Sequence, residues 1–204
     1  MTTYTVYSGY DGYILYTAGS YANNRAGTTT PSVNTTGTIA YLGQDGSGGT
    51  DSVYEAFVSF DTSSVVGTVA SATLSLYGAE NGTTTDFIAT AAIRDFGATL
   101  EAADWVAGDS LSGLTTVATF DTTGYAASYM AFTDVAFPAN VNVGGNTRII
   151  LYSSRTSGNN NPTGLEYFGF STVDASGTSQ DPKLVIVTAG SRPQRHRPYH
   201  IWRS

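Results

Sequence analysis

The chain has 204 residues, of which 41% are hydrophobic and only 12% are charged, and it contains no cysteine. This composition allows one sizeable core and is too apolar for a disordered chain, so we expect one folded domain. The formal net charge of -7 disfavours binding to nucleic acids or anionic membranes, because an acidic surface repels phosphate groups. The absence of cysteine excludes disulfides and thiolate chemistry.

The N-terminal residues do not form a basic start followed by an apolar core, so no Sec-type signal peptide is expected. The longest aliphatic runs, RIILY and KLVIV, are too short to cross a bilayer. We therefore expect a soluble protein that is made in the cytoplasm and does not insert into membranes.

Short stretches in which apolar and polar residues alternate recur along the chain, separated by clusters of Gly, Asn, Asp and Ser. In VYEAFVSF, for example, Tyr54, Ala56, Val58 and Phe60 share one face, which is the period of a β-strand. The expected strands, in chain order, are 3–10, 12–16, 53–60, 70–78, 87–95, 114–120, 128–133, 148–153, 165–170 and 183–187. The only helical candidate is LEAADW, at 100–105.

About ten strands predict an all-β fold, a two-sheet antiparallel β-sandwich of the jelly-roll type with at most one short helix. A sheet of this size buries one face best against a second sheet. The long polar loops QDGSGGTDS and SRTSGNNNPTG are expected at the ends of the sandwich, where binding usually occurs. We expect the sandwich domain over 1–189 and an extended C-terminal arm over 190–204, whose prolines oppose helix and central strand.

The ending SRPQRHRPYHIWRS reverses the charge of the chain. It carries four of the nine Lys and Arg residues, or +4, whereas the preceding residues carry 5 minus 16, or -11. A frayed, solvated terminus is the simplest interpretation. However, Arg and aromatic residues are enriched at protein interfaces, so we prefer an anchor peptide that lies on an acidic neighbouring subunit. The residues expected to bind the partner are Arg192, Arg195, Arg197, Tyr199, Ile201, Trp202 and Arg203.

Patterns that indicate catalysis are weak. Both histidines, His196 and His200, lie in the terminal segment, and no G-x-S-x-G motif exists, so nucleophilic catalysis is not expected. None of the sixteen acidic residues has a sequence context that predicts the raised pKa of a glycosidase acid. We expect no enzymatic activity and no cofactor, and an enzyme that acts on polysaccharide is the least supported alternative.

DGSGGTDSVYEAF superficially resembles a calcium loop, but Ser47 and Gly49 occupy its third and fifth positions. Its acid Glu55 falls one residue short of the twelfth position, so an EF-hand is rejected. A mobile polar loop is the preferred interpretation, and a looser calcium site between loops is the alternative. The candidate ligands of that alternative are Asp45, Asp51, Asp174 and Asp181.

Fourteen tyrosines and two tryptophans offer surfaces on which sugar rings can stack. Tyrosines at alternating positions, such as Tyr4 and Tyr10, are also typical of half-buried strands, and this structural explanation is preferred.

The segments GYDGYI, FVSFDTSSV, ASATLSLYG, ADW, TTGY and TVDASGTSQDPKLVIVT resemble the jelly-roll domain of virion surface proteins from tailed phages of actinobacteria. The resemblance spans nearly all of 7–188, and its most telling part is GTSQDPKLVIV, in which Pro182 opens the last strand. The architecture is also similar to carbohydrate-binding modules of bacterial surface and polysaccharide-degrading enzymes. The resemblance implies a virion structural role and supplies no catalytic residues.

We therefore expect a non-enzymatic protein on the virion surface, most simply a capsid decoration protein and alternatively a minor tail protein. Many relatives are parts of longer chains, whereas this domain begins almost at Met1. The arm is thus expected to bind the major capsid or tail protein of the same virion. A homo-oligomer or other symmetric arrangement of copies is expected. The alternative function is a carbohydrate-binding module that recognises a host cell-surface glycan.

Overall fold

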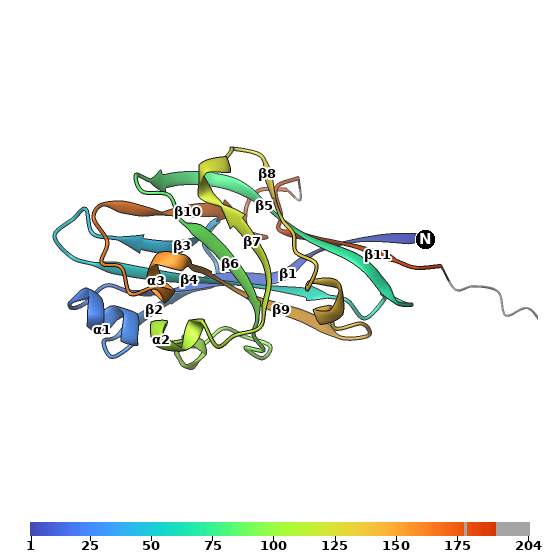
Figure 1. Cartoon of the computed structure of the whole chain (residues 1–204), viewed down its shortest axis with the longest axis horizontal. Coiled ribbons are helices and arrows are strands. Elements are labelled where there is room, and N and C mark those ends of the chain that lie inside the picture. Colours follow the sequence, from blue (N-terminus) through green and yellow to red (C-terminus); the bar gives the residue numbers. More distant parts are fainter. Residues whose placement is uncertain (178, 191–204) are drawn as a thin grey trace, which may run out of the picture.

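The computed structural model describes residues 1–177 and 179–190, which form an all-β fold with paired strands in antiparallel orientation (Figure 1). The strands in this part of the chain are β1 (Thr2–Tyr16), β2 (Pro31–Asn34), β3 (Ile39–Asp45), β4 (Ser52–Asp61), β5 (Val69–Thr83), β6 (Ile88–Ile93), β7 (Thr116–Asp121), β8 (Tyr129–Phe132), β9 (Asn146–Ser153), β10 (Leu165–Ser171) and β11 (Lys183–Thr188). The predicted antiparallel β-sandwich is confirmed. Apart from Gly190, the predicted arm lies outside the described residues.

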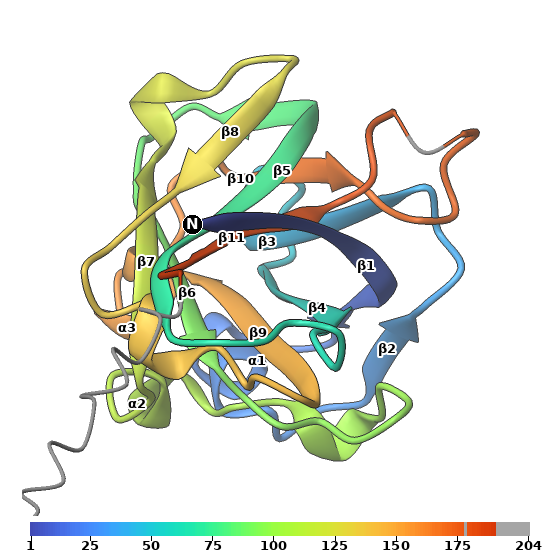
Figure 2. The same ribbon diagram turned by 90° about the vertical axis from the view of Figure 1, so that its right-hand side faces the viewer.

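Two long strands, β1 and β5, belong to both layers of the sandwich. The first half of β1 pairs with β11, and its second half pairs with β4. In the same way, β5 pairs with β11 through its first half and with β10 through its second half. The path β1-β11-β5-β10-β3-β4 therefore closes into a ring, and β9, β6 and β7 continue outward from β4. Figure 2 shows β8, β5, β11 and β1 in the layer that faces the viewer.

The layer that contains β4 and β9 is buried on both faces. Its inner face packs Phe60 and neighbouring residues against Leu74 of β5 and Phe168 of β10 in the main core. Its outer face carries a second core, in which Phe57 and Ile150 are covered by the β6–β7 connection. Each large apolar side chain that is fully buried contributes roughly 1.5–3 kcal/mol of transfer free energy.

The strand predictions were wrong for three strands, β1, β2 and β3. The expected strands 3–10 and 12–16 form one strand, β1, with an irregularity in its pairing between Ser8 and Tyr10. A bulge of this kind bends a strand without ending it. Strands β2 and β3 were not predicted, although β3 alternates like the others, with Ala40, Leu42 and Gln44 buried. Its Gly43 and the adjoining glycine-rich stretch resemble a loop in sequence.

The described residues contain three short α-helices, where at most one was expected: α1 (Tyr21–Ala26), α2 (Gly108–Leu111) and α3 (Ser154–Ser157). α1 begins after Ser20, whose side chain accepts a hydrogen bond from the N–H of Asn23, and ends at Gly27 in a left-handed conformation. These helices are too short to show an apolar stripe. The helix expected at 100–105 is a single 3₁₀ turn, Ala102–Asp104. None of the helices described is long and apolar enough to span a membrane.

Both ends of the described chain lie at one end of the molecule, which we call the terminal end (Figure 1). The N–H of Ala189 donates to the carbonyl oxygen of Thr68 over 2.8 Å. A Cβ atom built on Gly190 would lie 3.2 Å from the amino nitrogen of Met1. The turn between β3 and β4 lies at the opposite end, which we call the hairpin end (Figure 1).

Candidate functional site

Four tyrosines from four different strands surround a small cavity, which we call the tyrosine pocket. They are Tyr13 of β1, Tyr41 of β3, Tyr54 of β4 and Tyr167 of β10. The pocket has a volume of about 260 Å³, and its other lining residues are Leu15 and Glu80. All six side chains are partly buried, so each is held by packing and still has an exposed surface.

The tyrosine rings contact one another edge to face or at a tilt. The ring centroid of Tyr41 lies 5.4 Å from that of Tyr13 and 5.7 Å from that of Tyr167. Tyr54 lies 5.6 Å from Tyr167 and 5.9 Å from Tyr41. Such arrangements are attractive because the positive edge of one ring faces the negative face of the next. The rings therefore form a connected wall.

Glycines on the neighbouring strands make room for these rings. Tyr167 stands opposite Gly43 on one side and Gly82 on the other, and Tyr41 stands opposite Gly169. Because glycine has no side chain, each ring can lie across the backbone of the adjacent strand. A Cβ atom at Gly82 would come within 2.7 Å of the ring of Tyr167. The pocket thus depends on the register of tyrosine against glycine.

Glu80 of β5 is held by two of the tyrosines. The hydroxyl groups of Tyr41 and Tyr167 donate to its two carboxylate oxygens over 2.8 Å and 3.0 Å. Burial, followed by these contacts with Glu80, raises the pKa of Tyr167 to about 12 and also raises that of Tyr41. Both phenols therefore keep their protons at neutral pH, and each acts as a donor to Glu80.

The pocket combines aromatic surface with negative charge. The ionisable groups that act most strongly on Tyr54 and Tyr167 include the carboxylates of Asp45 and Glu80. Aromatic rings can stack on a sugar or face a cation, and a carboxylate can accept from hydroxyl or ammonium groups. The arrangement is therefore suited to binding a sugar ring or a cation.

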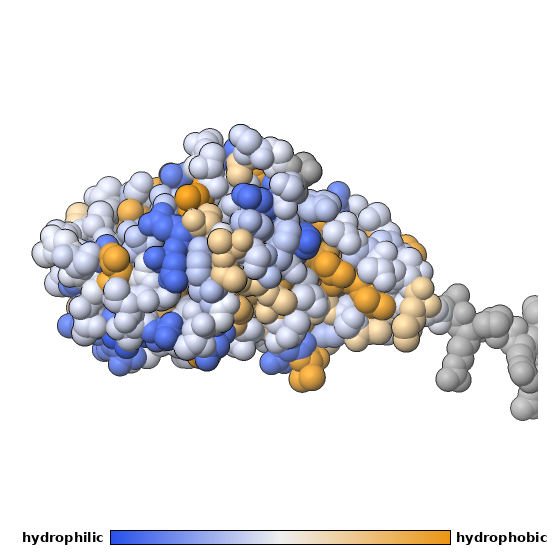
Figure 3. Space-filling view, turned by 90° about the horizontal axis from the view of Figure 1, so that it is seen from above, coloured by the Kyte–Doolittle hydropathy of each residue, from blue (hydrophilic) through white to orange (hydrophobic). Residues whose placement is uncertain are grey.

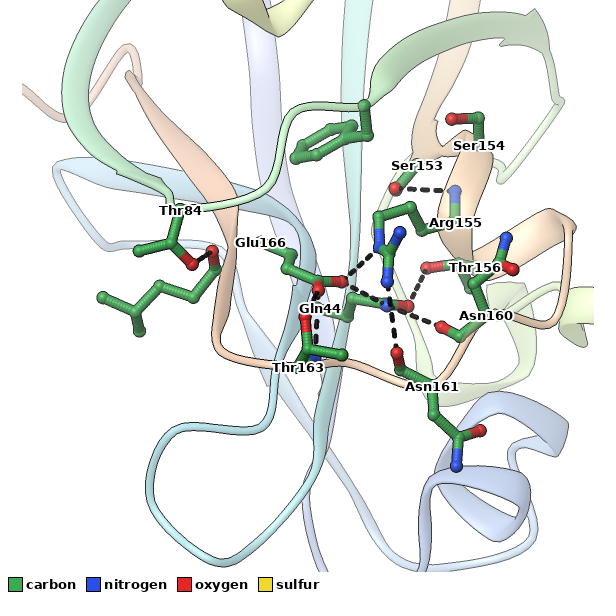
Figure 4. A network of polar contacts seen from close by, with 12 residues as sticks. Gln44, Thr84, Ser153, Ser154, Arg155, Thr156, Asn160, Asn161, Thr163 and Glu166 are labelled. Carbon is green, nitrogen blue, oxygen red and sulfur yellow. Dashed lines mark hydrogen bonds and ion pairs between the residues drawn. The ribbon is translucent and has the colours of Figure 1, made fainter.

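A second polar cluster is centred on Glu166 of β10 (Figure 4). Its buried carboxylate accepts hydrogen bonds from Gln44 over 2.6 Å, from the backbone N–H and the hydroxyl of Thr163 over 2.9 Å each, and from Arg155. Burial raises the pKa of Glu166, but these hydrogen bonds outweigh burial and hold the pKa below its ordinary value. Since its donors come from the chain itself, this cluster fixes the β9–β10 connection to the sheet and is structural.

The predicted partner-binding residues, 192–203, and both histidines lie outside the described residues. The four candidate calcium ligands lie in two regions: Asp45 is the last residue of β3 and Asp51 precedes β4, whereas Asp174 and Asp181 lie between β10 and β11. Asp51 accepts a hydrogen bond from the backbone N–H of Tyr21 over 3.1 Å. In residues 1–177 and 179–190, no group of three or more acidic or histidine side chains is arranged to hold a metal ion.

Burial raises the pKa of three carboxyl groups, those of Asp11, Glu55 and Asp181, which the sequence did not predict. Burial, with smaller contributions from Asp174 and Asp181, raises the pKa of Asp11 to about 7, although a backbone hydrogen bond from Val173 opposes the shift. Burial also raises the pKa of Glu55 well above its ordinary value. The exposed fractions of Asp11 and Glu55 are 1% and 0%, so neither carboxyl is accessible to a substrate.

No known family model matches the chain, and no curated protein is significantly similar to it. The candidate site therefore rests on geometry. The sequence indicates aromatic stacking only in general and does not single out the four pocket tyrosines. The available signal was glycine inside strands, at Gly43, Gly82 and Gly169, because such glycines often mark the close approach of another group.

Proposed function

We propose that this protein is a non-enzymatic structural domain on the surface of a tailed-phage virion, most simply a capsid decoration protein. It docks on the major capsid protein through its C-terminal segment, and docking on a tail protein is the alternative. The observation that carries the proposal is the contrast between the -11 charge of the first 190 residues and the +4 charge of the last fourteen. Such a contrast favours a segment that binds an acidic surface on another subunit.

The shape of the molecule is compatible with this attachment. The basic segment continues from Gly190, which lies beside Met1 at the terminal end (Figure 1). The apolar groups visible in Figure 3 are larger on the half of the molecule nearer to this end. That half includes a groove of about 450 Å³ between 70–73 and the 133–138 segment, beside which Val135 is 97% exposed. Exposed apolar surface of this kind favours contact with a partner.

Removal of the basic segment tests the proposal. A variant that ends at Gly190 should no longer co-sediment with purified virions that lack the native protein, whereas the full chain should. The control is the melting temperature and the circular dichroism spectrum, which should match those of the full chain. Retention of the truncated protein on virions would contradict the proposed attachment.

Charge reversal separates the role of charge from that of length. Replacement of Arg195, Arg197 and Arg203 by Glu should weaken co-sedimentation, and the wild-type interaction should weaken as the salt concentration rises. Exposed ion pairs are screened over about 10 Å at 0.1 M salt, whereas buried pairs are screened less. If the reversed protein binds as well as wild type, the arginines do not form the anchor.

A second function, binding of a host cell-surface glycan, is favoured by the tyrosine pocket. Its aromatic wall and carboxylate provide the stacking surface and the hydroxyl acceptor that sugar recognition requires. The residues that β1 and β5 contribute to the pocket lie in the second halves of these strands, whereas the first halves lead to the terminal end (Figure 1). A protein docked by its terminal end would leave this pocket free, and many copies on one particle would raise a weak affinity by avidity.

A glycan array tests the second function. Residues 1–190 should bind a subset of bacterial cell-wall glycans, and Tyr41→Ala together with Tyr167→Ala should abolish that binding. The matched control is Tyr7→Ala, since Tyr7 is 48% exposed and does not line the pocket. If the wild-type protein binds no cell-wall glycan on the array, the second function is contradicted and only the structural function stays proposed.

A further inference from the structure

Within residues 1–177 and 179–190, no cation of the chain balances the charge of the tyrosine pocket. Glu80 is the charged residue of the lining, and its carboxylate accepts two neutral phenol hydroxyl groups. Among the described residues, neither Lys nor Arg lines the pocket. The faces of tyrosine rings are electron-rich and attract cations. The pocket therefore has the electrostatic character of a site for a positively charged group.

The cations of the described residues are placed elsewhere. Three arginines form ion pairs with acids that do not line the pocket: Arg25 with Asp109, Arg148 with Asp95 and Arg155 with Glu166. Arg94 acts on the buried Glu55, and Lys183 lies over the ring of Tyr129, with its Nζ atom 3.5 Å from the ring centroid. This last contact is a cation–π interaction within the chain. The pocket offers the same type of contact, with a carboxylate added, to a ligand.

The size of the pocket restricts the ligand. Its volume of about 260 Å³ lies just below the roughly 300–1,000 Å³ of pockets that enclose drug-sized molecules. This space suits one sugar ring or one small organic ammonium group, and it is too small for an enclosed oligosaccharide. A neutral sugar would stack on the rings but would leave the carboxylate of Glu80 without a counter-charge. A sugar with a free amino group satisfies both features.

We propose that the tyrosine pocket binds an amino sugar whose protonated amine pairs with Glu80 and faces the tyrosine rings. This inference rests on the glycan-binding function proposed above and specifies its ligand class. A partly exposed cation–π contact and an exposed ion pair each strengthen binding by roughly threefold. Together they predict a preference of about tenfold for the charged form of a sugar over its neutral analogue.

Three related sugars test the inference directly on the wild-type full chain. Glucosamine carries the free amine, N-acetylglucosamine carries the same nitrogen as a neutral amide, and glucose carries a hydroxyl group at that position. Calorimetric titration at pH 6 and constant ionic strength should give an affinity for glucosamine about tenfold higher than for either neutral sugar. Tetramethylammonium is the fourth ligand, since it has the charge without the sugar ring.

Two variants test whether Glu80 causes the preference for glucosamine. Glu80→Gln keeps a side-chain carbonyl that can accept from a tyrosine hydroxyl but removes the charge, so the preference for glucosamine should fall to about threefold or less. Glu101→Gln is the matched control, because Glu101 is exposed and does not line the pocket. It should retain the full preference. Melting temperatures establish that both variants fold, and the ligand series on the wild-type chain tests the inference without any variant.

The outcomes separate this inference from the function on which it rests. Equal affinities for the three sugars would overturn the amine preference and support glycan binding. Binding of tetramethylammonium without binding of any sugar would support cation recognition and overturn glycan binding. Absence of binding to all four ligands would overturn both, whereas a preference that survives in Glu80→Gln would overturn the assigned role of Glu80.

Discussion

The ring of Tyr167 lies across Gly82, its partner in the antiparallel pairing of β10 with β5. On its other side Tyr167 faces Gly43, so that a single tyrosine is framed by glycines on both neighbouring strands. Glycine weakens a strand because it has no side chain to pack, and an aromatic ring laid over it restores that contact. Here the same ring also carries the hydroxyl group that donates to Glu80. The strand packing and the pocket are therefore made by the same residues.

Gly82→Ala should damage the pocket more than the fold. The new Cβ atom would come within 2.7 Å of the ring of Tyr167, which can swing aside because it is a side chain. We expect a loss of unfolding free energy of about 1–2 kcal/mol and the loss of the hydrogen bond from Tyr167 to Glu80. Urea denaturation measures the first effect, and ligand titration measures the second. Wild-type ligand affinity in this variant would show that the ring position does not matter.

Gly43→Ala should damage the fold itself. The backbone of Gly43 has φ of 120°, which side chains rarely allow, and a Cβ atom there would collide with the carbonyl oxygen of Glu166. Because backbone atoms of two strands cannot separate without breaking the pairing, we expect a loss of about 3 kcal/mol or more. The control is Gly48→Ala, which meets no atom within 4 Å and should change stability by less than about 0.5 kcal/mol. Similar effects of the two substitutions would contradict the argument.

The sequence was sufficient to predict the all-β class and nine of the strand regions, because alternation of apolar residues follows directly from burial of one strand face. It was not sufficient for β2, which pairs with β1 at an edge and has no buried residue in Pro31–Asn34. The tyrosine pocket could not be predicted from the sequence for a different reason. Tyr13, Tyr41, Tyr54 and Tyr167 are brought together only by pairings between distant strands, and no local pattern encodes that register.

The raised pKa values were unpredictable for a related reason. Asp11 follows Tyr10 in a segment of small and polar residues that resembles a turn, yet the pairing of β1 with β4 buries it. Burial shifts the pKa of a carboxyl group, and burial depends on the tertiary structure. The two ends of α1, in contrast, are indicated by Ser20 and Gly27, which are typical residues at the ends of a helix.

Removal of the buried acid Glu166 and of the exposed acid Asp109 from their ion pairs should give very different results. Glu166→Ala leaves the donors of Arg155, Gln44 and Thr163 without their common acceptor inside the protein. Removal of one partner from a buried charged network costs about 3–5 kcal/mol, which chemical denaturation at pH 7 should reveal. Because the pKa of Glu166 is lowered, its contribution is present at neutral pH and is lost as the pH falls below its lowered value.

The matched control for Glu166 is Asp109, which pairs with Arg25 over 2.6 Å but whose side chain is 88% exposed. Arg25 keeps hydrogen bonds to the carbonyl oxygens of Thr156 and Ser157 when Asp109 is removed. Asp109→Ala should therefore reduce stability by less than about 1 kcal/mol. Equal losses for the two substitutions would mean that burial does not determine the strength of these pairs.

Asp11 should make the protein less stable as the pH rises from 4 to 7. Its pKa is raised from 3.8 to about 7 in the folded protein, so in this range the native state holds a proton that the unfolded chain has released. The unfolding free energy therefore decreases with pH, by up to about 4 kcal/mol for this group, and levels off above pH 7. Glu55, whose pKa burial also raises, contributes a slope of the same sign.

Asp11→Asn removes the group that binds this proton and retains a carbonyl oxygen that can accept from the backbone N–H of Val173. Urea denaturation at intervals between pH 4 and pH 8 should give a shallower slope for the variant, which should be more stable than wild type at pH 8. Asp61→Asn serves as the control, because Asp61 is exposed and its pKa is lowered by hydrogen bonds from Ser63, so the slope above pH 4 should not change. If Asp11→Asn keeps the wild-type slope, or destabilises the protein equally at every pH, the buried carboxyl does not carry a proton near neutrality.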